Sequence, residues 1–304
     1  MRIIFHIDVN SAYLSWTAVE QLKNGAGVDI RTIPAIIGGD QKSRHGIVLA
    51  KSISAKKYGI RTGEPVANAF RKCPNLKTYL PDHQMYREYS RKLMEFLRTY
   101  TTHIEQVSVD ECYLDYTSIA SRFSSPEEGA AYIRNYIYSH FGFTVNVGIS
   151  SNKVLAKMAS DFMKPDRVHT LWKSEIQTKM WPLPVSELFY VGHASLNKLR
   201  KLGIHTIGEL AATDPGILQA HMKSQGLLIW QYANGIDETA VIDTPPPAKG
   251  YGNSLTTSQD VTEPGIAKQY LLSLSETIAA RLRADGVKIG VVSISLRDWD
   301  LRFY

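Results

Sequence analysis

Two acidic residues stand side by side in the stretch SVDECYLD, which covers residues 108–115. The stretch otherwise reads as β-strand, yet Asp110 and Glu111 are poor strand formers, and adjacent strand residues point to opposite faces of a sheet. Two like charges this close repel each other, and burial would raise their pKa values unless a positive charge lay between them. The pair therefore indicates either a turn that exposes both carboxylates to water or a site for a cation.

A third carboxylate, Asp8, ends the apolar run RIIFHIDV, which predicts a buried strand. Further strands are expected in a hairpin around the acidic pair and at 144–150, with helices at 83–101 and 125–142. This order predicts an α+β sheet of the split βαβ kind with helices on one face. In that arrangement the first strand lies beside the hairpin, which places Asp8 next to the acidic pair.

Three carboxylates that converge with no His or Cys nearby in the sequence suit Mg²⁺ or Mn²⁺ better than zinc. Two such ions ~3.5–4 Å apart can hold the attacking and leaving oxygens of an in-line phosphoryl displacement. The ligand shared by both ions would most simply be Asp8 or Asp110. The plain alternative is an exposed acidic turn and a satisfied aspartate at the end of a strand, and the spacing alone leaves both open.

Composition sets the broad class. With 304 residues the chain is long enough for two or more domains, and its net charge of +6 fits a polyanionic partner without proving one. Cys73 and Cys112 form no CxxC pair, so free thiols in a reducing compartment are expected. The N-terminus lacks the apolar core of a signal peptide, and no run is long enough to span a membrane. We therefore expect a cytoplasmic protein that contacts no membrane.

The rest of the chain divides into further parts. Residues 172–238 read as helical, with a helix, a short hairpin at 190–195, and a second helix closed by Gly203. Three successive prolines within 244–249 mark a stiff linker. A helix at about 264–285 and a strand over 287–300 follow, and the chain stops where another strand is expected, so the last domain is predicted to be truncated.

Five stretches, in order along nearly the whole chain, resemble the Y-family translesion DNA polymerases of the DinB/UmuC type. They are HIDVNSAYLS, AKSISAKKYGI, SVDECYLD, VGISSNKVLAKMASDFMKPD and VGHASLNKLRKLGIHTIGELA. Within the family, the opening DVNSAY is slightly closer to the UmuC side. The resemblance covers far more than a single motif, and it adds to the reading of the acidic residues without replacing it.

The resemblance implies a right-hand polymerase of several domains. Its α+β, ferredoxin-like palm would span 1–10 and 82–171, and its small fingers 11–81. A helical thumb with a helix–hairpin–helix would span 172–238, a linker 239–249, and a partial little-finger domain 250–304. Small fingers would enclose the nascent base pair loosely, which fits error-prone synthesis.

The resemblance also assigns roles to residues. It implies Asp8, Asp110 and Glu111 as catalytic metal ligands, helped by the backbone carbonyl of Val9. It makes Tyr13 the steric gate, whose ring leaves no room for a 2′-hydroxyl. Nucleotide contacts would come from Ser11, Lys56 and Lys164, and DNA contacts from Ser108, Gly192, Ser195 and Lys198.

Each of these residues also has a purely structural explanation. Tyr13 could be one more core aromatic, lone lysines are usually solvated, and the thumb segment could be a plain αα-hairpin. Three positions depart from the family pattern: Ile53 stands where a Tyr is common, Lys56 where an Arg is common, and Tyr190 where the hairpin usually has a first glycine. Ile53 cannot donate a hydrogen bond to a phosphate, and Lys lacks the bidentate fork of Arg. The grip on the triphosphate is therefore expected to be weaker or moved to another group.

The predicted activity is template-directed, error-prone addition of dNTPs to a primer 3′-hydroxyl with two Mg²⁺ ions, for which Mn²⁺ can substitute. The implied partners are primer–template DNA, dNTP and the replication sliding clamp, whose binding peptide in this family usually lies beyond where this chain stops; a monomer is expected. Two other functions stay open: a nucleotidyl cyclase on the same palm, and a DNA-binding repair protein with a weak or inactive palm. Primer extension separates them.

Overall fold

The computed structural model describes residues 2–39, 46–244, 247–298, 300 and 302. The chain divides into two compact units, which are described separately. The first contains residues 1–38 and 47–245, and the second contains residues 39–46 and 246–304. No helix among the described residues is long and apolar enough to cross a membrane.

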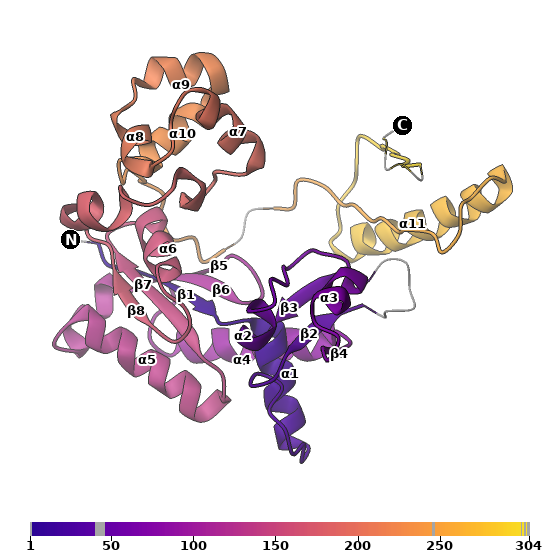
Figure 1. Cartoon of the computed structure of the whole chain (residues 1–304), viewed down its shortest axis with the longest axis horizontal. Helices are drawn as coiled ribbons and strands as arrows, with labels where there is room; N and C mark the ends of the chain where they lie inside the picture. The colour runs from indigo at the N-terminus through magenta and orange to yellow at the C-terminus, as the bar shows by residue number, and fades with distance from the viewer. Residues whose placement is uncertain (1, 40–45, 245–246, 299, 301, 303–304) are drawn as a thin grey trace. The chain divides into compact units, whose positions relative to one another are not determined.

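A five-stranded sheet forms the centre of the first unit (Figure 1). Its order is β5 (Ile104–Gln106), β6 (Glu111–Asp115), β1 (Ile4–Val9), β7 (Val145–Ser150) and β8 (Val168–Thr170). Strand β1 pairs antiparallel with both β6 and β7, and Asp8 stands directly opposite Glu111. The prediction that the first strand lies beside the hairpin is confirmed.

Side chains of β1 alternate between the two faces of this sheet, as a strand requires. Phe5, Ile7 and Val9 belong to the main core, which is completed by helices α4 (His83–Arg98) and α5 (Pro126–Phe141). These two helices share one face, as expected. Helix α6 (Lys153–Asp161) covers the opposite face, which the expected arrangement with helices on one face had left open.

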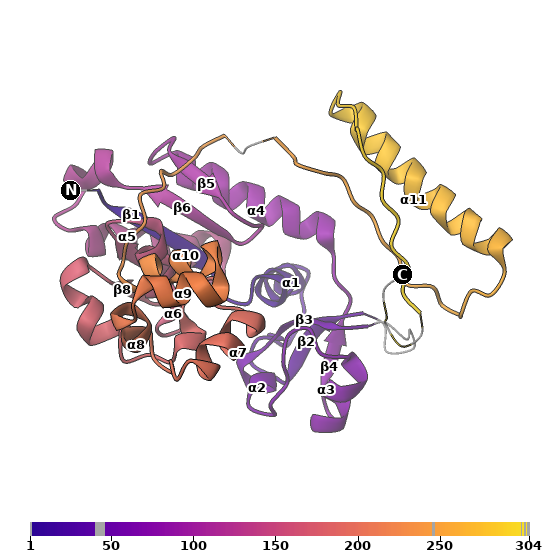
Figure 2. The ribbon, with the colours of Figure 1, turned by 90° about the horizontal axis from the view of Figure 1, so that it is seen from above.

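Helix α1 (Ala12–Lys23) joins two cores (Figure 2). Its Trp16 packs into the main core, whereas Leu14 and Ala18 pack against a second, three-stranded sheet. That sheet has the order β3 (Val48–Lys51), β2 (Ala35–Gly38), β4 (Lys77–Tyr79) and is accompanied by α2 (Ile53–Lys56) and α3 (Val66–Lys72). Because α1 packs on both sides, it fixes the end of β1 against the end of β3.

A helical module with its own core follows the main sheet. It contains α7 (His193–Lys201), α8 (Ile207–Ala212), α9 (Pro215–Met222) and α10 (Ser224–Ala233). The helix expected ahead of the hairpin is reduced to a 3₁₀ turn, Val185–Glu187, because Pro182 and Pro184 cannot sit inside a helix. Short 3₁₀ segments also occupy Thr117–Arg122 and Lys173–Glu175, with one π-helical turn at Ile176–Met180.

The segment after α10 returns to the main sheet before the chain leaves the first unit. Arg2 donates to the carbonyl of Thr239, Lys153 donates to the carbonyl of Ala240, and the amide of Ile242 donates to Glu105. Residues 239–242, expected to begin the linker, are therefore bound to the segments around the main sheet. The prolines come after this docked stretch.

The second unit has one helix among its described residues, α11 (Pro264–Ala284), close to the predicted bounds. The strand predicted over 287–300 is not formed in the described residues 287–298, and Trp299 lies outside the described residues. Val291 and Val292 are exposed by 84% and 77%. A strand needs a partner for its backbone hydrogen bonds, and the described part of this unit supplies no neighbouring strand.

Candidate active site

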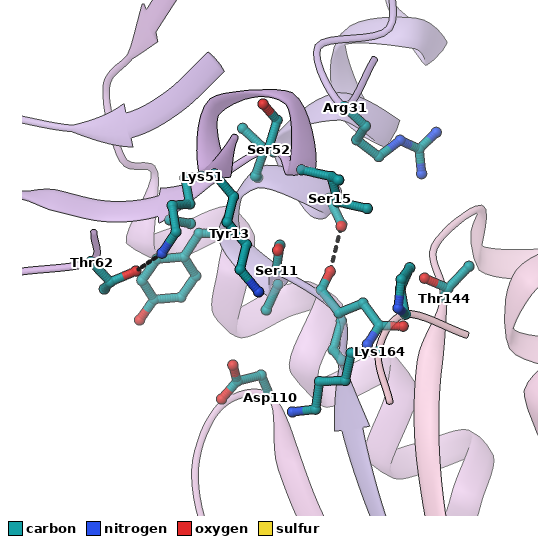
Figure 3. A pocket seen from close by; sticks show the side chains of 18 of the residues that line it. Ser11, Tyr13, Ser15, Arg31, Lys51, Ser52, Thr62, Asp110, Thr144 and Lys164 are labelled. Carbon is teal, nitrogen blue, oxygen red and sulfur yellow. Dashed lines mark hydrogen bonds between the residues drawn. The ribbon is translucent and has the colours of Figure 1, made fainter. Parts of the chain in front are cut away.

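A cavity of about 600 Å³ opens where the end of β1 and the start of α1 meet β3 and α2 (Figure 3). Asp8 and Val9 reach it from the end of β1, and Asp110 reaches it from the turn before β6. The other predicted site residues that line it are Ser11, Tyr13, Lys56 and Lys164. Segments separated by more than a hundred residues thus meet at one place.

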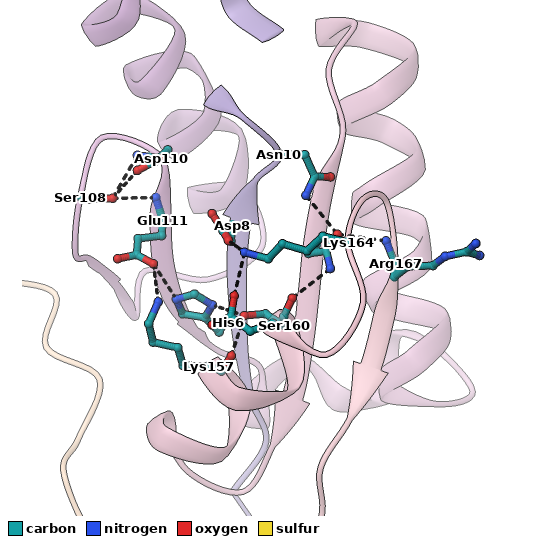
Figure 4. A network of polar contacts seen from close by, with 12 residues as sticks. His6, Asp8, Asn10, Ser108, Asp110, Glu111, Lys157, Ser160, Lys164 and Arg167 are labelled. Carbon is teal, nitrogen blue, oxygen red and sulfur yellow. Dashed lines mark hydrogen bonds and ion pairs between the residues drawn. The ribbon is translucent and has the colours of Figure 1, made fainter. Parts of the chain in front are cut away.

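The acidic residues of β1 and β6 are each held by a lysine from the α6 region (Figure 4). Lys164 donates to Asp8, and Lys157 Nζ lies 2.7 Å from Glu111 Oε2. Nε2 of the buried His6 also lies 3.3 Å from Glu111 Oε2. In the part of the chain that the structure describes, no three Asp, Glu, His or Cys side chains gather closely enough to hold a metal ion. In this structure Asp8 and Glu111 are each paired with a lysine, and the metal site expected from the three carboxylates stays a prediction.

Burial and these lysines set the charge of the acids. Burial raises the pKa of Asp8, with Lys164 opposing it. The contact with His6, together with Lys157, lowers the pKa of Glu111 to about 2 against the effect of burial. Burial also disfavours the charged form of Lys164, but Asp8 and Asp161 outweigh it and raise its pKa. Glu111 is thus firmly ionised, whereas the charge of Asp8 depends on a neighbouring cation.

Asp110 lies in a turn that begins at Ser108. Ser108 Oγ accepts from the amides of Asp110 and Glu111 at 3.3 and 3.1 Å, and it donates to Asp110 Oδ1 at 2.6 Å. The amide of Val9 donates to the carbonyl of Asp110, which fixes the turn to β1. Asp110 is therefore in a turn and Glu111 begins a strand, and both are only partly exposed, so the expected turn that shows both carboxylates fully to water is not formed, and the cation site stays a prediction.

Tyr13 lines the cavity and packs against the main core at the same time. Its ring stacks on that of Tyr86 with 4.3 Å between centroids and an interplanar angle of 6°, and His83 meets it edge-on. Tyr86 is buried, and its hydroxyl lies 3.1 Å from that of Thr17. The ring of Tyr13 is therefore a rigid part of the cavity wall.

Sequence reasoning missed two cations of the cavity, Lys51 and Arg31. Arg31 is paired with Asp29 at 2.8 Å and donates to the carbonyl of Gly142. Lys51 ends β3, five residues before Lys56, and nothing in the local pattern marks it as different from a solvated lysine. Only the meeting of β3 with β1 shows that it faces the same space.

Of the predicted DNA contacts, Ser108 lies in the turn beside Asp110, whereas Gly192, Ser195 and Lys198 lie on the helical module. Gly192 is the N-cap of α7, which carries Ser195 and Lys198 on its first turns. Tyr190 adopts φ of +71°, the left-handed backbone that a glycine usually supplies. The hairpin thus keeps a glycine-like backbone in spite of the tyrosine, and Lys198 reaches the carbonyl of His221 at 3.4 Å.

The first unit thus combines a mixed sheet with acids at the end of its central strand, a cavity lined by cations and a separate helical module, an arrangement that fits an enzyme acting on nucleotides. A family profile described as the impB/mucB/samB family matches residues 7–161, and the profile of its C-terminal domain matches residues 248–304. The chain belongs to this family, that of the Y-family DNA polymerases.

Named relatives agree with the family. The chain is 49% identical over 303 residues to a "DNA polymerase IV" of Clostridium acetobutylicum, covering all of this chain and 76% of the relative. It is 38% identical over 302 residues to "DNA polymerase IV 1" of Bacillus subtilis, covering 98% of this chain and 71% of that relative. These names support the DinB type, which corrects the expectation drawn from DVNSAY of a chain closer to UmuC.

The fold agrees as well. The solved structure of a "Y-family DNA polymerase chimera Dbh-Dpo4(243-245)-Dbh" matches with a TM-score of 0.82 at 22% identity, covering 99% of this chain and 86% of that one. The chain therefore has the fold of Y-family polymerases, as the sequence predicted.

Proposed function

We propose that the cavity between β1, α1 and β3 is the dNTP site of a lesion-bypass polymerase. The chain is a DNA-directed DNA polymerase of the DinB type, and its substrates are primer–template DNA and dNTPs. The observation that carries the proposal for the site is that one cavity joins Asp8 and Asp110 with Lys56, Lys164 and the ring of Tyr13. In this proposal the acids take part in catalysis, the lysines bind the triphosphate, and the ring of Tyr13 lies against the sugar.

In this proposal the chain positions the two reactants. The primer 3′-hydroxyl attacks the α-phosphate of the dNTP, and pyrophosphate leaves. Lys56 and Lys164 lie against the triphosphate, where a cation offsets the charge that builds on the leaving group. The deoxyribose lies over Tyr13, and Ser11 adds a contact to the nucleotide. The rigid stack of Tyr13 on Tyr86 makes the exclusion of a 2′-hydroxyl sharp.

Y-family polymerases depend on divalent metal ions. Asp8, Asp110 and Glu111 supply the hard oxygen donors that Mg²⁺ prefers, with Mn²⁺ as a substitute. Asp8 and Glu111 are ionic partners of Lys164 and Lys157 in this structure, so a metal ion bound by these acids would take the place of the ammonium groups. When bound, two such ions would polarise the primer hydroxyl and neutralise the leaving pyrophosphate.

The helical module is proposed to hold the duplex. Backbone amides at the start of α7, with Ser195 and Lys198, would contact a DNA phosphate beside Gly192 and read no sequence. Ser108 would lie close to the primer end. From the bacterial relatives we also infer a cytoplasmic location, whereas a monomer and sliding-clamp binding stay predictions.

Substitution of one acid tests the site. Asp110→Ala should reduce primer extension to background while leaving binding of a primer–template duplex largely unchanged, because Asp110 lines the cavity and not the helical module. Asp115→Ala is the matched control: Asp115 ends β6, the strand that follows the turn of Asp110, and lies outside the cavity, so its loss should leave extension intact. Full extension by Asp110→Ala would refute the assignment.

The other two functions weighed from the sequence are not favoured, because the relatives are named DNA polymerase IV. A nucleotidyl cyclase would consume a nucleoside triphosphate without any primer. Incubation with dNTPs and Mg²⁺, with and without a primer–template, distinguishes it from a polymerase.

A further inference from the structure

Two lysines of the cavity, Lys51 and Lys56, form no ion pair with any described residue. The other two cations of the cavity are paired, Arg31 with Asp29 and Lys164 with Asp8. Among the described residues, the positive charge at the β3–α2 end of the cavity is therefore the part that no ion pair balances.

Lys51 is held in place by a hydrogen bond, and its burial disfavours the charged form of its side chain. Its Nζ donates to Thr62 Oγ1 at 3.1 Å, and both residues line the cavity. Burial lowers the pKa of Lys51, and the nearby charge of Lys56 lowers it further, against the smaller opposing effect of Glu64. A half-buried ammonium beside a second one is stabilised by a bound anion, and an ordinary solvated lysine meets neither condition.

The side chain of Ile53, near Lys51, cannot bind an anion through a hydrogen bond. Ile53 lines the same cavity two residues after Lys51 and is 55% exposed, yet it has no hydrogen-bond donor in its side chain. It starts α2, where the family often has a tyrosine. The chain thus lacks a hydroxyl donor at Ile53 but places an ammonium next to that position.

We propose that Lys51 is a binding residue for the polyphosphate of the incoming nucleotide, which takes over the contact that Ile53 cannot make. Lys51 and Lys56 then form a pair of cations for one triphosphate, with Lys164 at the acidic end of the cavity. This inference rests on the proposed function of the cavity. It assigns the missing phosphate contact to Lys51, which the family pattern does not identify as a nucleotide-binding residue.

Lys51→Met tests the inference, with Lys57→Met as the matched control. Lys57 is an exposed lysine of the same segment that does not line the cavity. Steady-state extension should show a KM for dNTP raised about tenfold or more in Lys51→Met, as expected for the loss of a hydrogen bond to a charged group. The kcat and the melting temperature should change little, and Lys57→Met should match the unchanged chain.

A second measurement does not depend on catalysis. Calorimetric titration with inorganic tripolyphosphate and Mg²⁺ should give weaker binding for Lys51→Met by a similar factor. Adding Ile53→Tyr to Lys51→Met should restore part of the KM, because it returns a hydroxyl donor to the cavity. Unchanged KM and unchanged tripolyphosphate binding in Lys51→Met, or an equal loss in Lys57→Met, overturns the inference.

The two proposals fail in different ways. If the unchanged chain binds tripolyphosphate through Lys51 but extends no primer, the proposed function of the cavity is wrong and the role of Lys51 stands. If the chain extends primers normally and Lys51→Met does so with the same KM, the role of Lys51 is wrong and the polymerase site stands.

Discussion

Tyr13 shows how one side chain serves both the core and the site. Its ring is fixed on one side by the buried Tyr86, while the cavity lies beside it. In the proposed dNTP site, a ring that cannot move aside would discriminate by shape, because a 2′-hydroxyl on the sugar would meet it. A flexible exposed side chain would not reject a 2′-hydroxyl in this way.

Removing that ring should relax the choice of sugar. Tyr13→Ala is expected to raise the ratio of rNTP to dNTP incorporation, measured as the ratio of kcat/KM values in single-nucleotide extension. Tyr58→Ala serves as the control, since Tyr58 is an exposed tyrosine that does not line the cavity. An unchanged sugar preference in Tyr13→Ala would remove Tyr13 from the gate.

Tyr190 carries backbone strain that can be measured. A non-glycine residue in the left-handed region costs roughly 1–2 kcal/mol, and Tyr190 has φ of +71°. Tyr190→Gly should therefore be more stable to urea than Tyr190→Ala by about 1 kcal/mol, since both lose the ring and only Gly loses the strain.

The same comparison at Tyr58, which is exposed and has no positive φ, should give the opposite order. There the alanine variant is expected to be more stable, because glycine gains more freedom in the unfolded chain. Equal stability of Tyr190→Gly and Tyr190→Ala would mean that the hairpin relaxes without cost.

At the scale of elements, α6 positions the lysines of the site by packing directly on β7. A methyl group added at Gly148 would meet the carbonyl oxygen of Ala156 at 1.9 Å and the amide of Ser160 at 2.4 Å. Both are backbone atoms of α6, so the helix itself would have to move. With it would move Lys157, which neutralises Glu111.

Gly148→Ala should therefore cost about 2–3 kcal/mol or more of unfolding free energy, measured by urea denaturation. Gly27→Ala is the matched control, because nothing lies within 4 Å of its added methyl group, and it should stay within about 0.5 kcal/mol. A small effect of Gly148→Ala would mean that α6 is not fixed by this contact.

Much of the sheet could be predicted, because it depends on short periods in the sequence. The apolar pattern of β1 and the order of the elements suffice to place Asp8 next to the acidic pair, whereas the register that sets it opposite Glu111 comes from the structure. The position of Lys164 was expected only from the family resemblance, and its pairing with Asp8 was not expected at all. The spacing of residues in the sequence does not reveal which distant element a long side chain such as lysine will contact.

Lys51 and Arg31 are site residues that the sequence alone could not identify. Each lies in a segment whose local pattern is ordinary, and each enters the site because α1 packs on two cores at once. The strand predicted after α11 failed for a related reason: alternating apolar residues indicate a strand, but the strand forms only where a neighbour accepts its hydrogen bonds.

At the scale of the whole molecule, the two units differ in how much core they hold. Among the described residues, every buried apolar side chain lies between Ile4 and Ala233, and α11 has no buried residue. Burial of apolar surface is the main favourable term in folding. The first unit should therefore carry nearly all of the stability of the chain.

A fragment of residues 1–245 should thus unfold at nearly the temperature of the full chain, within about 2 °C, since a change of 1 kcal/mol shifts the midpoint of a domain of 150–250 residues by about 2–4 °C. Scanning calorimetry of both chains at equal concentration makes the comparison. The full chain should show no added transition of comparable enthalpy. A fall of the midpoint well beyond this range in the fragment would mean that residues 246–304 stabilise the first unit through contacts, and would contradict the division of the chain into independent units.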